Sequence, residues 1–407
     1  MQRTTKRWWP LVAAWALAIS GAPALAKKPE LPGDGWQRVT PTGPVIGADG
    51  KSHTAMCSGY PGTVPTYHFW TRTSSTSKNL VVFFEGGGAC WDNFTCTFPI
   101  AGLPPQVPQF FVPSIDPATD PASYDGIFRS DRADNPVRDW NMVYIPYCTG
   151  DLHVGSTAKQ YYNAGHPVFT LPSPFTLQHR GFDNFMVVLD WMKKNIDKPK
   201  EILVTGSSAG GYGATANFPW VQESFRNAHV SVIADASQGV STANFDASEP
   251  GRNSWNPQLA PWVFGASPPT LRSANLLRAG AAAYPHTKVA QFSTNYDNVQ
   301  IGFYGAMTQI NPPGGACPIV PLDWNQQMLA SLNSYAATVP NYRHYLAAGG
   351  YHTLMRSPQF YAEASAGLRY ADWVGTMLAN RGGTNGQGGG NWKNVACPGC
   401  LVAPTCP

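Results

Sequence analysis

The sequence predicts an α/β fold with one mainly parallel sheet, helices on both faces and long loop insertions. Short apolar runs alternate with segments that have helical periodicity, as in strand–helix–strand units. The apolar runs are continuous rather than alternating with polar residues, which indicates a sheet that is buried on both sides. Glycines and polar residues follow several of these runs directly, where the strand-end loops of an α/β domain carry functional groups.

The first 26 residues have the pattern of a secretory signal peptide. Basic residues precede an apolar segment at 11–19, and the region ends in an Ala-x-Ala cleavage site at 24–26. The apolar segment is too short to span a membrane. We therefore expect a mature chain that begins near Lys27 and is secreted, to the periplasm or to the extracellular space.

The composition of the expected mature chain excludes some classes of partner. Removing residues 1–26 takes away three positive charges and no acidic ones, so the formal net charge falls from +4 to +1. A nearly neutral chain has no electrostatic reason to bind nucleic acid or an anionic membrane. All eight cysteines lie in the mature part, and an even number in an exported chain predicts disulfides. Cys397 and Cys400 form a C-x-x-C pair, for which a zinc site is the alternative, but no second pair accompanies it.

A glycine-rich loop at 85–91 follows the first clear central strand, 80–84. Glycines let a backbone approach a ligand closely and present its amide groups. A phosphate-binding loop would need a Gly-Lys-Ser/Thr or G-x-G-x-x-G spacing, which this loop lacks. We therefore expect it to stabilise an oxyanion, as the glycine loop ahead of the nucleophile does in esterases.

The remaining elements are expected in an alternating order along the chain. Strands are expected at 67–70, 140–148, 202–204, 230–234, 288–293 and 342–347. Helices are expected at 180–195, 214–225 and 357–378. Residues 238–270 lack periodicity and suit a lid or a pocket wall. Residues 381–391 are Gly- and Asn-rich, so we divide the mature chain into a domain at 27–380 and a Gly- and Cys-rich tail at 381–407.

The turn between strand 202–204 and helix 214–225 contains the motif on which the functional prediction depends. It has the pattern G-x-S-x-G, with Gly206, Ser208 and Gly210 in the fixed places. A nucleophilic serine at a strand-to-helix elbow has a strained backbone and needs small neighbours two residues away. The following helix directs its N-terminal amides at developing negative charge. The alternative is an ordinary tight turn between a strand and a helix.

An activated serine needs a base that takes its proton and an acid that orients this base. In α/β-hydrolases these groups follow the serine in the order Ser, Asp or Glu, His, each after a strand. Of the nine histidines, His352 is the one in a glycine-rich loop beyond the last strand, and Asp297 follows the strand before it. Asp235 also ends a strand and is the alternative acid.

Several short motifs in a fixed order carry a family resemblance, namely Cys57, Glu85-Gly-Gly-Gly-Ala-Cys90, Tyr147-Cys148, Gly206-Ser-Ser-Ala-Gly-Gly211, Tyr296-Asp-Asn-Val-Gln300 and His352. In these residues the chain resembles the pectin acetylesterase family, which includes the animal Notum carboxylesterases. The resemblance implies an α/β-hydrolase-like fold, hydrolysis of carboxylic esters and no cofactor. At the catalytic positions of the family, the resemblance places Ser208, Asp297 and His352. The oxyanion places fall on the amides of Gly87, Gly88 and Ala209.

We expect two disulfides near the predicted site. A Cys90–Cys96 bridge would fix the loop after the oxyanion glycines, and a Cys57–Cys148 bridge would tie the N-terminal segment to the end of a central strand. Cys317 and the three C-terminal cysteines would form two more bridges.

Deacetylation of a polysaccharide such as pectin is the function that the sequence favours. Plant members of the family usually have tryptophan where Ala89 stands and serine-glycine after the aspartate at 235, and both departures lie near the expected acyl pocket. The alternatives are a lipid, aryl or polyester esterase with the same triad and a non-catalytic carbohydrate-binding protein. Polar residues within 238–254 argue against a continuous apolar lining, so we expect acetyl or butyryl esters to be preferred over octanoyl esters.

Overall fold

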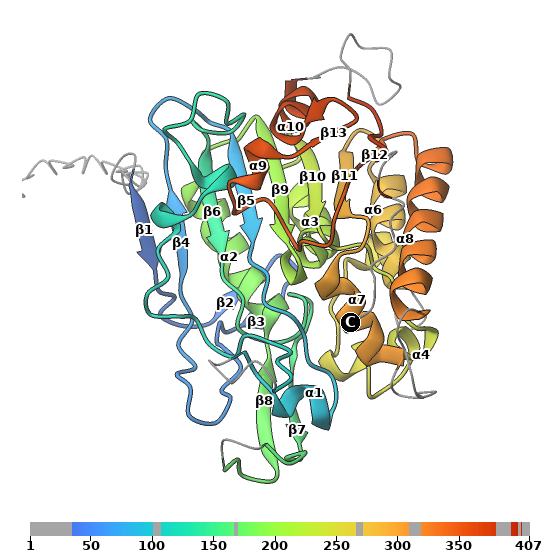
Figure 1. Cartoon of the computed structure of the whole chain (residues 1–407). Coiled ribbons are helices and arrows are strands. Elements are labelled where there is room, and N and C mark those ends of the chain that lie inside the picture. The colour runs from blue at the N-terminus through green and yellow to red at the C-terminus, as the bar shows by residue number, and fades with distance from the viewer. Residues whose placement is uncertain are drawn as a thin grey trace, which may run out of the picture. The chain divides into compact units, whose positions relative to one another are not determined.

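An eight-stranded, mainly parallel sheet forms the centre of the fold. In the computed structural model, which describes residues 35–100, 107–166, 170–265, 272–308, 319–379, 392–397 and 400, the strand order is β1-β4-β6-β5-β9-β10-β11-β12 (Figure 1). The strands are β1 (Trp36–Val39), β4 (Phe69–Arg72), β5 (Leu80–Phe84), β6 (Asn141–Ile145), β9 (Glu201–Ser207), β10 (His229–Asp235), β11 (Lys288–Thr294) and β12 (Tyr342–Ala347). From β6 to β12 in this order all neighbours pair in parallel, whereas β1 and β4 pair antiparallel. The predicted α/β fold class is confirmed.

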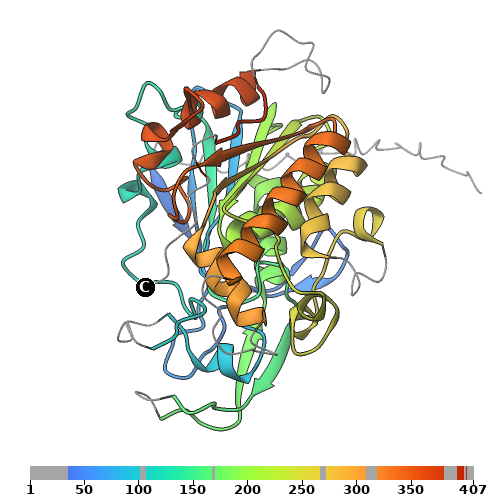
Figure 2. The ribbon, with the colours of Figure 1, turned by 45° about the vertical axis from the view of Figure 1, so that its right-hand side comes forward.

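Helices cover both faces of this sheet (Figures 1 and 2). One face carries α2 (Gly181–Asn195), α3 (Ala209–Ser224), α6 (Leu276–Ala283), α7 (Asn298–Thr308) and α8 (Ile319–Thr338). The other face carries α9 (Gln359–Ala362), α10 (Tyr370–Ala379) and the 3₁₀ turn η2 (Gly126–Phe128).

The alternation of side chains along each strand separates two hydrophobic cores. In β5, Leu80, Val82 and Phe84 join the core beneath α2 and α3, and Val81 and Phe83 join the core beneath α10. All five side chains are fully buried. Successive residues of a strand point to opposite faces, so a strand covered on both sides must be apolar throughout. This explains why the strand is a continuous apolar run in the sequence.

The smaller elements lie outside the large sheet. They are β2 (Val45–Ile46), β3 (Ser52–His53), α1 (Asn93–Thr97), η1 (Pro121–Ser123), β7 (Thr157–Tyr161), β8 (Phe175–His179), α4 (Ala243–Ala247), η3 (Arg252–Trp255), α5 (Pro261–Phe264) and η5 (Ser273–Asn275). Strands β7 and β8 form an antiparallel pair that contacts α1 and η3. The described part of the segment expected to form a lid or a pocket wall, residues 238–265, therefore contains three short helical elements.

The prediction of one long helix at 357–378 is wrong. The chain forms α9, then a hairpin of β13 (Ala364–Ser365) and β14 (Leu368–Arg369), and only then α10. Ala366 and Gly367 form the hairpin turn with φ angles of 48° and 76°. A tight hairpin turn favours positive φ at both central residues, and such a backbone interrupts a helix. The helical periodicity of this region did not reveal the two-residue turn.

Three disulfides lie in the described part of the chain. Cys57–Cys148 and Cys90–Cys96 form as predicted, and Cys397 pairs with Cys400, which removes the zinc alternative for that pair. Cys317, Cys406, the expected signal peptide and the Gly-rich segment lie outside the described residues, as do the predicted domain boundaries. No helix of the described residues is long and apolar enough to cross a membrane.

A buried histidine connects the β2–β3 hairpin to α2. Nδ1 of His53 lies 2.7 Å from Asp183 in the first turn of α2, and Nε2 lies 2.8 Å from Asp49. Arg180 also lies 3.5 Å from Asp183. Burial alone would lower the pKa of His53, but the hydrogen bonds to Asp183 and Asp49 outweigh it and the pKa is raised. The ring is therefore protonated over a wider pH range than a free histidine.

We predict that this connection weakens as the pH rises. The pKa of His53 is higher in the folded than in the unfolded state, where it is about 6.5, so its stabilising effect is complete below that value and is lost as the pH rises through the folded pKa. Replacing His53 by Asn should lower the free energy of unfolding by roughly 1.5–3 kcal/mol near pH 5.5, and by less near pH 8.5. Urea unfolding of both proteins measures this, and equal losses at the two pH values would contradict the prediction.

Candidate active site

The carboxyl ends of the parallel strands bring the predicted site residues to one edge of the sheet. Ser208 directly follows β9, Gly86–Gly88 follow β5, and Asp297 and His352 lie in the loops after β11 and β12. Parallel strands that are neighbours end at the same edge, so groups that are far apart in the sequence meet there. Ser208 and His352 line the same pocket.

Ser208 sits in a strained turn between β9 and α3. Its φ and ψ are 58° and −126°, and its amide donates to the carbonyl of Asp235 at 2.8 Å. A Cβ atom at Gly210 would lie 2.0 Å from the carbonyl oxygen of Phe84, and one at Gly206 would lie 2.4 Å from the carbonyl oxygen of Gly210. Only glycine fits at these two places, which gives the G-x-S-x-G spacing its steric reason.

Asp297 orients the ring of His352. Nδ1 of His352 lies 2.8 and 2.9 Å from the two carboxylate oxygens of Asp297. The fully buried carboxylate also accepts hydrogen bonds from the amides of Val299 and Gln300 and from the side chain of Gln300, at 2.9–3.0 Å. With its Nδ1–H donated to Asp297, the ring has a lone pair on Nε2 that can accept a proton.

Nε2 of His352 is buried and has no hydrogen-bond partner, Ser208 included. The two groups share one pocket without touching through a hydrogen bond. Such contacts between a nucleophile and its base often tighten only when a substrate is bound. The arrangement therefore suits proton transfer from Ser208 to His352 once a substrate fills the pocket.

Asp235, the alternative acid, has different partners. Its fully buried carboxylate accepts hydrogen bonds from Ser207 Oγ at 2.6 Å and from the amides of Leu354 and Met355 at 3.1 and 3.0 Å. Burial raises the pKa of Asp235, and these hydrogen bonds act in the opposite direction. Asp235 thus joins the residue before Ser208 to the loop that contains His352, while the structure places Asp297 against the imidazole ring.

The glycine loop lies against the elbow. A Cβ atom at Gly86 would lie 2.9 Å from Cβ of Ser208. Two backbone hydrogen bonds of 2.8 Å fix the loop, from Val112 to the carbonyl of Gly87 and from Ala89 to the carbonyl of Phe110. Among the described residues, the amides of Gly87, Gly88 and Ala209, which are the predicted oxyanion donors, form no hydrogen bond with a backbone carbonyl. This arrangement suits donation to a ligand.

An ion pair that sequence reasoning missed connects the glycine loop to the histidine loop. Arg356 donates to Glu85 Oε1 at 2.7 Å, and the other carboxylate oxygen of Glu85 accepts from the amide of Tyr147 at 3.1 Å. The carbonyl of Glu85 accepts a hydrogen bond from His153 Nε2 at 2.8 Å. Burial lowers the pKa of His153 to about 4, so its ring is neutral near pH 7. Glu85 and Arg356 are 271 residues apart, and no local pattern pairs them.

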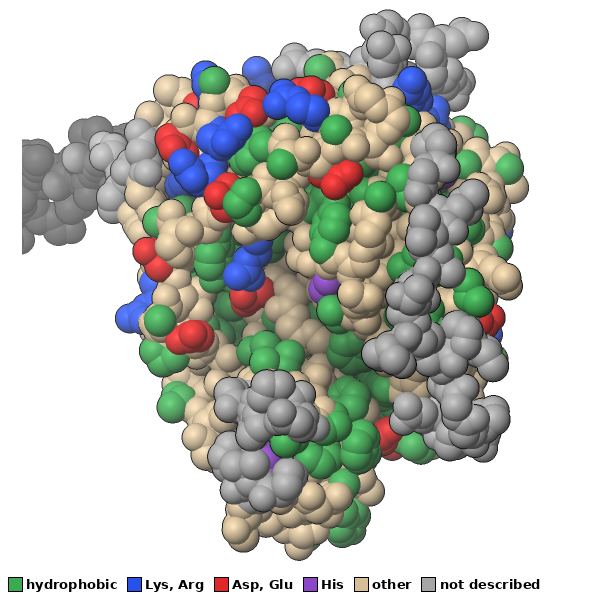
Figure 3. Space-filling model, viewed as in Figure 1, with side chains coloured by type: hydrophobic (Ala, Val, Ile, Leu, Met, Phe, Trp, Pro, Cys, Tyr) green, Lys and Arg blue, Asp and Glu red, His purple; other side chains and the backbone are tan. Residues whose placement is uncertain are grey.

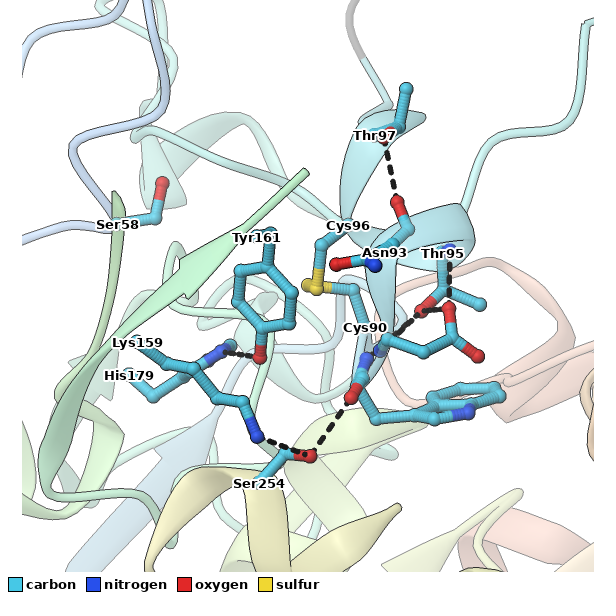
Figure 4. Close-up of a disulfide and its surroundings, with 12 residues drawn as sticks. Ser58, Cys90, Asn93, Thr95, Cys96, Thr97, Lys159, Tyr161, His179 and Ser254 are labelled. Atoms are coloured by element: carbon cyan, nitrogen blue, oxygen red, sulfur yellow. Dashed lines mark hydrogen bonds between the residues drawn. A yellow bond between two sulfur atoms is a disulfide. The ribbon is translucent and has the colours of Figure 1, made fainter. Parts of the chain in front are cut away.

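The Cys90–Cys96 disulfide fixes the chain immediately after the glycine loop (Figure 4). The amide of Cys90 donates to the carbonyl of Gly150 at 2.9 Å, and its carbonyl accepts from Trp255 Nε1 at 2.6 Å. Ser254 Oγ donates to the carbonyl of Trp91 at 2.9 Å. Because Ser254 and Trp255 belong to η3, these bonds hold the predicted pocket wall against the glycine loop.

His179 lies beside this disulfide, and the three side chains form the one group of possible metal ligands found among the described residues. The two sulfurs are bonded to each other. Both ring nitrogens of His179 are also in use, since Nε2 lies 2.8 Å from the hydroxyl of Tyr161 and Nδ1 lies 2.8 Å from the carbonyl of Thr149. This group therefore has a structural role in the oxidised protein.

A pocket opens beside Ser208. Most of its lining is apolar or small, namely Gly88, Ala89, Trp91, Leu152, Ala209, Ala236, Gly239, Val240, Phe245, Val299, Phe303 and Met307. Its polar lining consists of Ser208, Tyr212, Ser241, Ser273, Gln300 and His352. Figure 3 shows a hollow on this face of the protein that is bordered by hydrophobic, acidic, basic and histidine side chains.

Residues 238–254, for which we did not expect a continuous apolar lining, contribute both apolar and polar residues to the pocket. Val240 and Phe245 of this segment line the pocket. Asp246 is buried outside the lining, where its carboxylate accepts hydrogen bonds from Ser241 at 2.7 Å and Ser273 at 2.5 Å. The polar side chains of a short helix and its flanks can face away from a pocket while one aromatic side chain faces it, and the sequence alone does not reveal which do.

Comparison with known proteins agrees with this architecture. A sequence model of the pectinacetylesterase family matches residues 44–259, just over half of the chain. The chain belongs to the pectinacetylesterase family. The match contains Ser208 and the glycine loop, whereas Asp297 and His352 lie beyond it, so their assignment rests on geometry.

The relatives with similar sequences match only part of this chain. Palmitoleoyl-protein carboxylesterase NOTUM of Schmidtea mediterranea is 27% identical over 161 residues, which are 38% of this chain and 27% of the relative. Human NOTUM is 27% identical over 158 residues, 38% of this chain and 28% of the relative. Pectin acetylesterase 4 of Arabidopsis thaliana is 24% identical over 199 residues, 47% and 42% of the two chains. The matched segments thus span less than half the length of these relatives.

We predict that Asp297→Asn and Asp235→Asn have different effects. Asparagine at 297 stabilises the wrong tautomer of His352, so kcat for an ester should fall by roughly 10⁴ while the melting temperature changes little. Asparagine at 235 replaces an accepting carboxylate oxygen by an NH₂ group, which cannot accept the hydrogen bonds of Ser207, Leu354 and Met355. This variant should therefore lower the melting temperature, which Asp297→Asn changes little. If Asp235→Asn abolished activity in a stable protein and Asp297→Asn were nearly neutral, the two roles would have to be exchanged.

Proposed function

We propose that this protein is a serine carboxylic ester hydrolase that uses Ser208, His352 and Asp297. The observation that carries the proposal is the hydrogen bond from His352 Nδ1 to Asp297, which leaves Nε2 without a partner in the pocket of Ser208. A nucleophile, a base and an orienting acid at three strand ends have little use in a binding protein. The arrangement therefore favours an enzyme over the alternative of a carbohydrate-binding protein.

The proposed reaction has two steps. Ser208 Oγ attacks the ester carbonyl and passes its proton to His352 Nε2, and the amides of Gly87, Gly88 and Ala209 bind the oxyanion. The leaving alcohol takes the proton from His352, and an acyl-enzyme remains. Water then attacks this intermediate with His352 again as the base, which releases the acid and restores Ser208. Asp297 stabilises the imidazolium ion in both steps.

We also propose that the enzyme is secreted. The signal-peptide pattern at 1–26 supports export. The disulfides in the described part of the chain support folding in an oxidising compartment.

Two substrate classes are candidates. Acetylated polysaccharide such as pectin is the class that the sequence favours and the class that the names of the Arabidopsis relatives suggest. An ester with a larger apolar acyl group is the second candidate, because apolar side chains such as Val240, Phe245 and Phe303 line the pocket. Ala89, where plant members usually have tryptophan, leaves this space open, so the geometry supports the second class better.

We predict that Ser208→Ala abolishes ester hydrolysis in a folded protein. Loss of a triad nucleophile reduces kcat by about 10⁶ and leaves only the contribution of the oxyanion donors. The strained φ angle of Ser208 is retained in alanine, so the melting temperature should remain close to that of the parent protein. Substantial hydrolysis by this variant would overturn the proposed mechanism.

We predict that the pocket favours acyl groups longer than acetyl. Each buried methylene contributes about 0.8 kcal/mol, so kcat/KM should rise at least tenfold from nitrophenyl acetate to nitrophenyl hexanoate. Acetylated pectin and acetylated xylan, assayed beside them, test the polysaccharide class. Ala89→Trp is the matched variant, because it fills the pocket and should reverse the hexanoate-to-acetate ratio. The highest rate on acetate or on acetylated pectin would restore the small-acyl interpretation.

A further inference from the structure

Consecutive glycines make the predicted oxyanion loop dependent on the residues around it. Residues 86–88 have no side chains that could hold them, and Gly88 has a φ angle of 72°. Glycine has more conformational freedom than any other residue. The amides of Gly87 and Gly88 therefore keep a fixed direction only if the chain is held on both sides of the loop. The Cys90–Cys96 disulfide holds it on one side, and Glu85 is the residue on the other.

Hydrogen bonds hold both the backbone and the side chain of Glu85. Its amide donates to the carbonyl of Ile145 at 2.9 Å, and its carbonyl accepts from His153 Nε2 at 2.8 Å. One carboxylate oxygen accepts from the amide of Tyr147 at 3.1 Å, and the other accepts from Arg356 at 2.7 Å. The first three partners belong to β6 and the segment after it. Of these bonds, only the one from Arg356 leads to the loop that contains His352.

Arg356 is itself held in place within the histidine loop. The amide of the preceding residue, Met355, donates to the buried carboxylate of Asp235 at 3.0 Å. The guanidinium carbon of Arg356 lies 4.0 Å from the centroid of the Tyr124 ring, where the face of the ring attracts a cation. The guanidinium group therefore has a defined position from which it can fix the carboxylate of Glu85.

This ion pair is better placed to orient the loop than to stabilise the fold. The side chains of Glu85 and Arg356 are 18% and 31% exposed, so solvent partly screens their attraction. An ion pair of this kind contributes little to the free energy of unfolding. A displacement of reacting groups by about 1 Å, by contrast, can reduce a rate by about 10². Loss of the pair should therefore affect catalysis more than stability.

We propose that Glu85 and Arg356 are positioning residues for ester hydrolysis, which together hold the oxyanion amides of the glycine loop in place relative to His352. This inference rests on the proposed function and adds two residues to it. Neither side chain needs to touch the substrate. Glu85 acts through the amides of Gly87 and Gly88, and Arg356 acts from the loop that carries the base. The pair thus joins the group that takes up the proton to the groups that bind the oxyanion.

Glu85→Gln and Arg356→Met break this connection in two ways. Glutamine keeps the size of the side chain but has an NH₂ group in place of one accepting oxygen, and methionine removes every donor of the guanidinium group. Each variant should lower kcat for nitrophenyl acetate by about tenfold to a hundredfold, with a melting temperature close to that of the parent protein. Glu85→Gln keeps the proposal testable if Arg356→Met is too unstable to purify. A kcat within about twofold of the parent in each folded variant would overturn the proposal.

Arg369→Met is the matched control. Arg369 pairs with Asp372 at 2.8 Å and with Asp134 at 3.4 Å, outside the loops of the candidate site. Its replacement should leave kcat within about twofold of the parent, because an exposed ion pair far from the reaction contributes little. A loss as large as that of Arg356→Met would show that the removal of any ion pair slows the enzyme, and it would contradict the proposal.

The double variant tests whether the two residues act together. If they form one connection, Glu85→Gln combined with Arg356→Met should be no more than about twofold slower than the slower single variant. Losses that multiply would show two independent effects and would contradict a shared positioning role.

A thionoester reports on the oxyanion donors themselves. Its carbonyl oxygen is replaced by sulfur, which is larger and a weaker hydrogen-bond acceptor, so well-placed donors favour the oxygen ester. The ratio of kcat/KM for nitrophenyl acetate to that for nitrophenyl thionoacetate should fall by at least about threefold in Glu85→Gln and in Arg356→Met. Partial unfolding would slow both substrates equally and leave this ratio unchanged, as should the loss of the orienting acid in Asp297→Asn. An unchanged ratio in both ion-pair variants would sink the proposal.

Ser208→Ala separates this proposal from the proposed function. If Ser208→Ala abolishes hydrolysis while both ion-pair variants hydrolyse esters at the parent rate, the ester mechanism stands and the positioning role fails. Hydrolysis at the parent rate by Ser208→Ala would overturn the mechanism and this role with it.

Discussion

The buried carboxylate of Asp235 holds the two halves of the candidate site together. One half is the elbow, where Ser207 donates to this carboxylate, and the other is the histidine loop, whose amides at Leu354 and Met355 donate to it as well. A buried carboxylate is destabilising unless several donors surround it. Because these donors come from segments more than a hundred residues apart, Asp235 is satisfied only when β9, β10 and the loop after β12 are all in place. The geometry of the site and the assembly of the sheet therefore depend on each other.

Much of this arrangement could be predicted from the sequence, because it follows from local rules. The G-x-S-x-G spacing gave the elbow at Ser208, since the two glycines are the residues that fit against neighbouring carbonyls. The continuous apolar runs gave the parallel strands, and the order of polar residues after them indicated Asp297 and His352. The pairing of Cys90 with Cys96, only six residues apart, was predictable for a similar reason.

Features that depend on contacts between distant segments could not be predicted in this way. The ion pair of Glu85 with Arg356 joins two loops, and neither sequence neighbourhood signals the partner. The residues that line the pocket could not be predicted individually, because the sequence does not show that Phe245 lines the pocket while Asp246 accepts hydrogen bonds from Ser241 and Ser273. The turn at Ala366 and Gly367 breaks a segment with good helical periodicity, because positive φ at two residues is a local choice that packing selects.

The strained backbone of Ser208 lowers the stability of the fold at the residue that the proposed reaction uses. A side chain at a φ of 58° and a ψ of −126° costs roughly 1–3 kcal/mol, a cost that glycine would largely avoid. The proposed role of Ser208 as the nucleophile gives a reason for a serine at this position despite this cost. In a lineage that no longer used the ester, mutation to glycine would remove the nucleophile and stabilise the fold in a single step. Such a change would be difficult to reverse, so an inactive descendant would tend to persist as a more stable protein than its active ancestor.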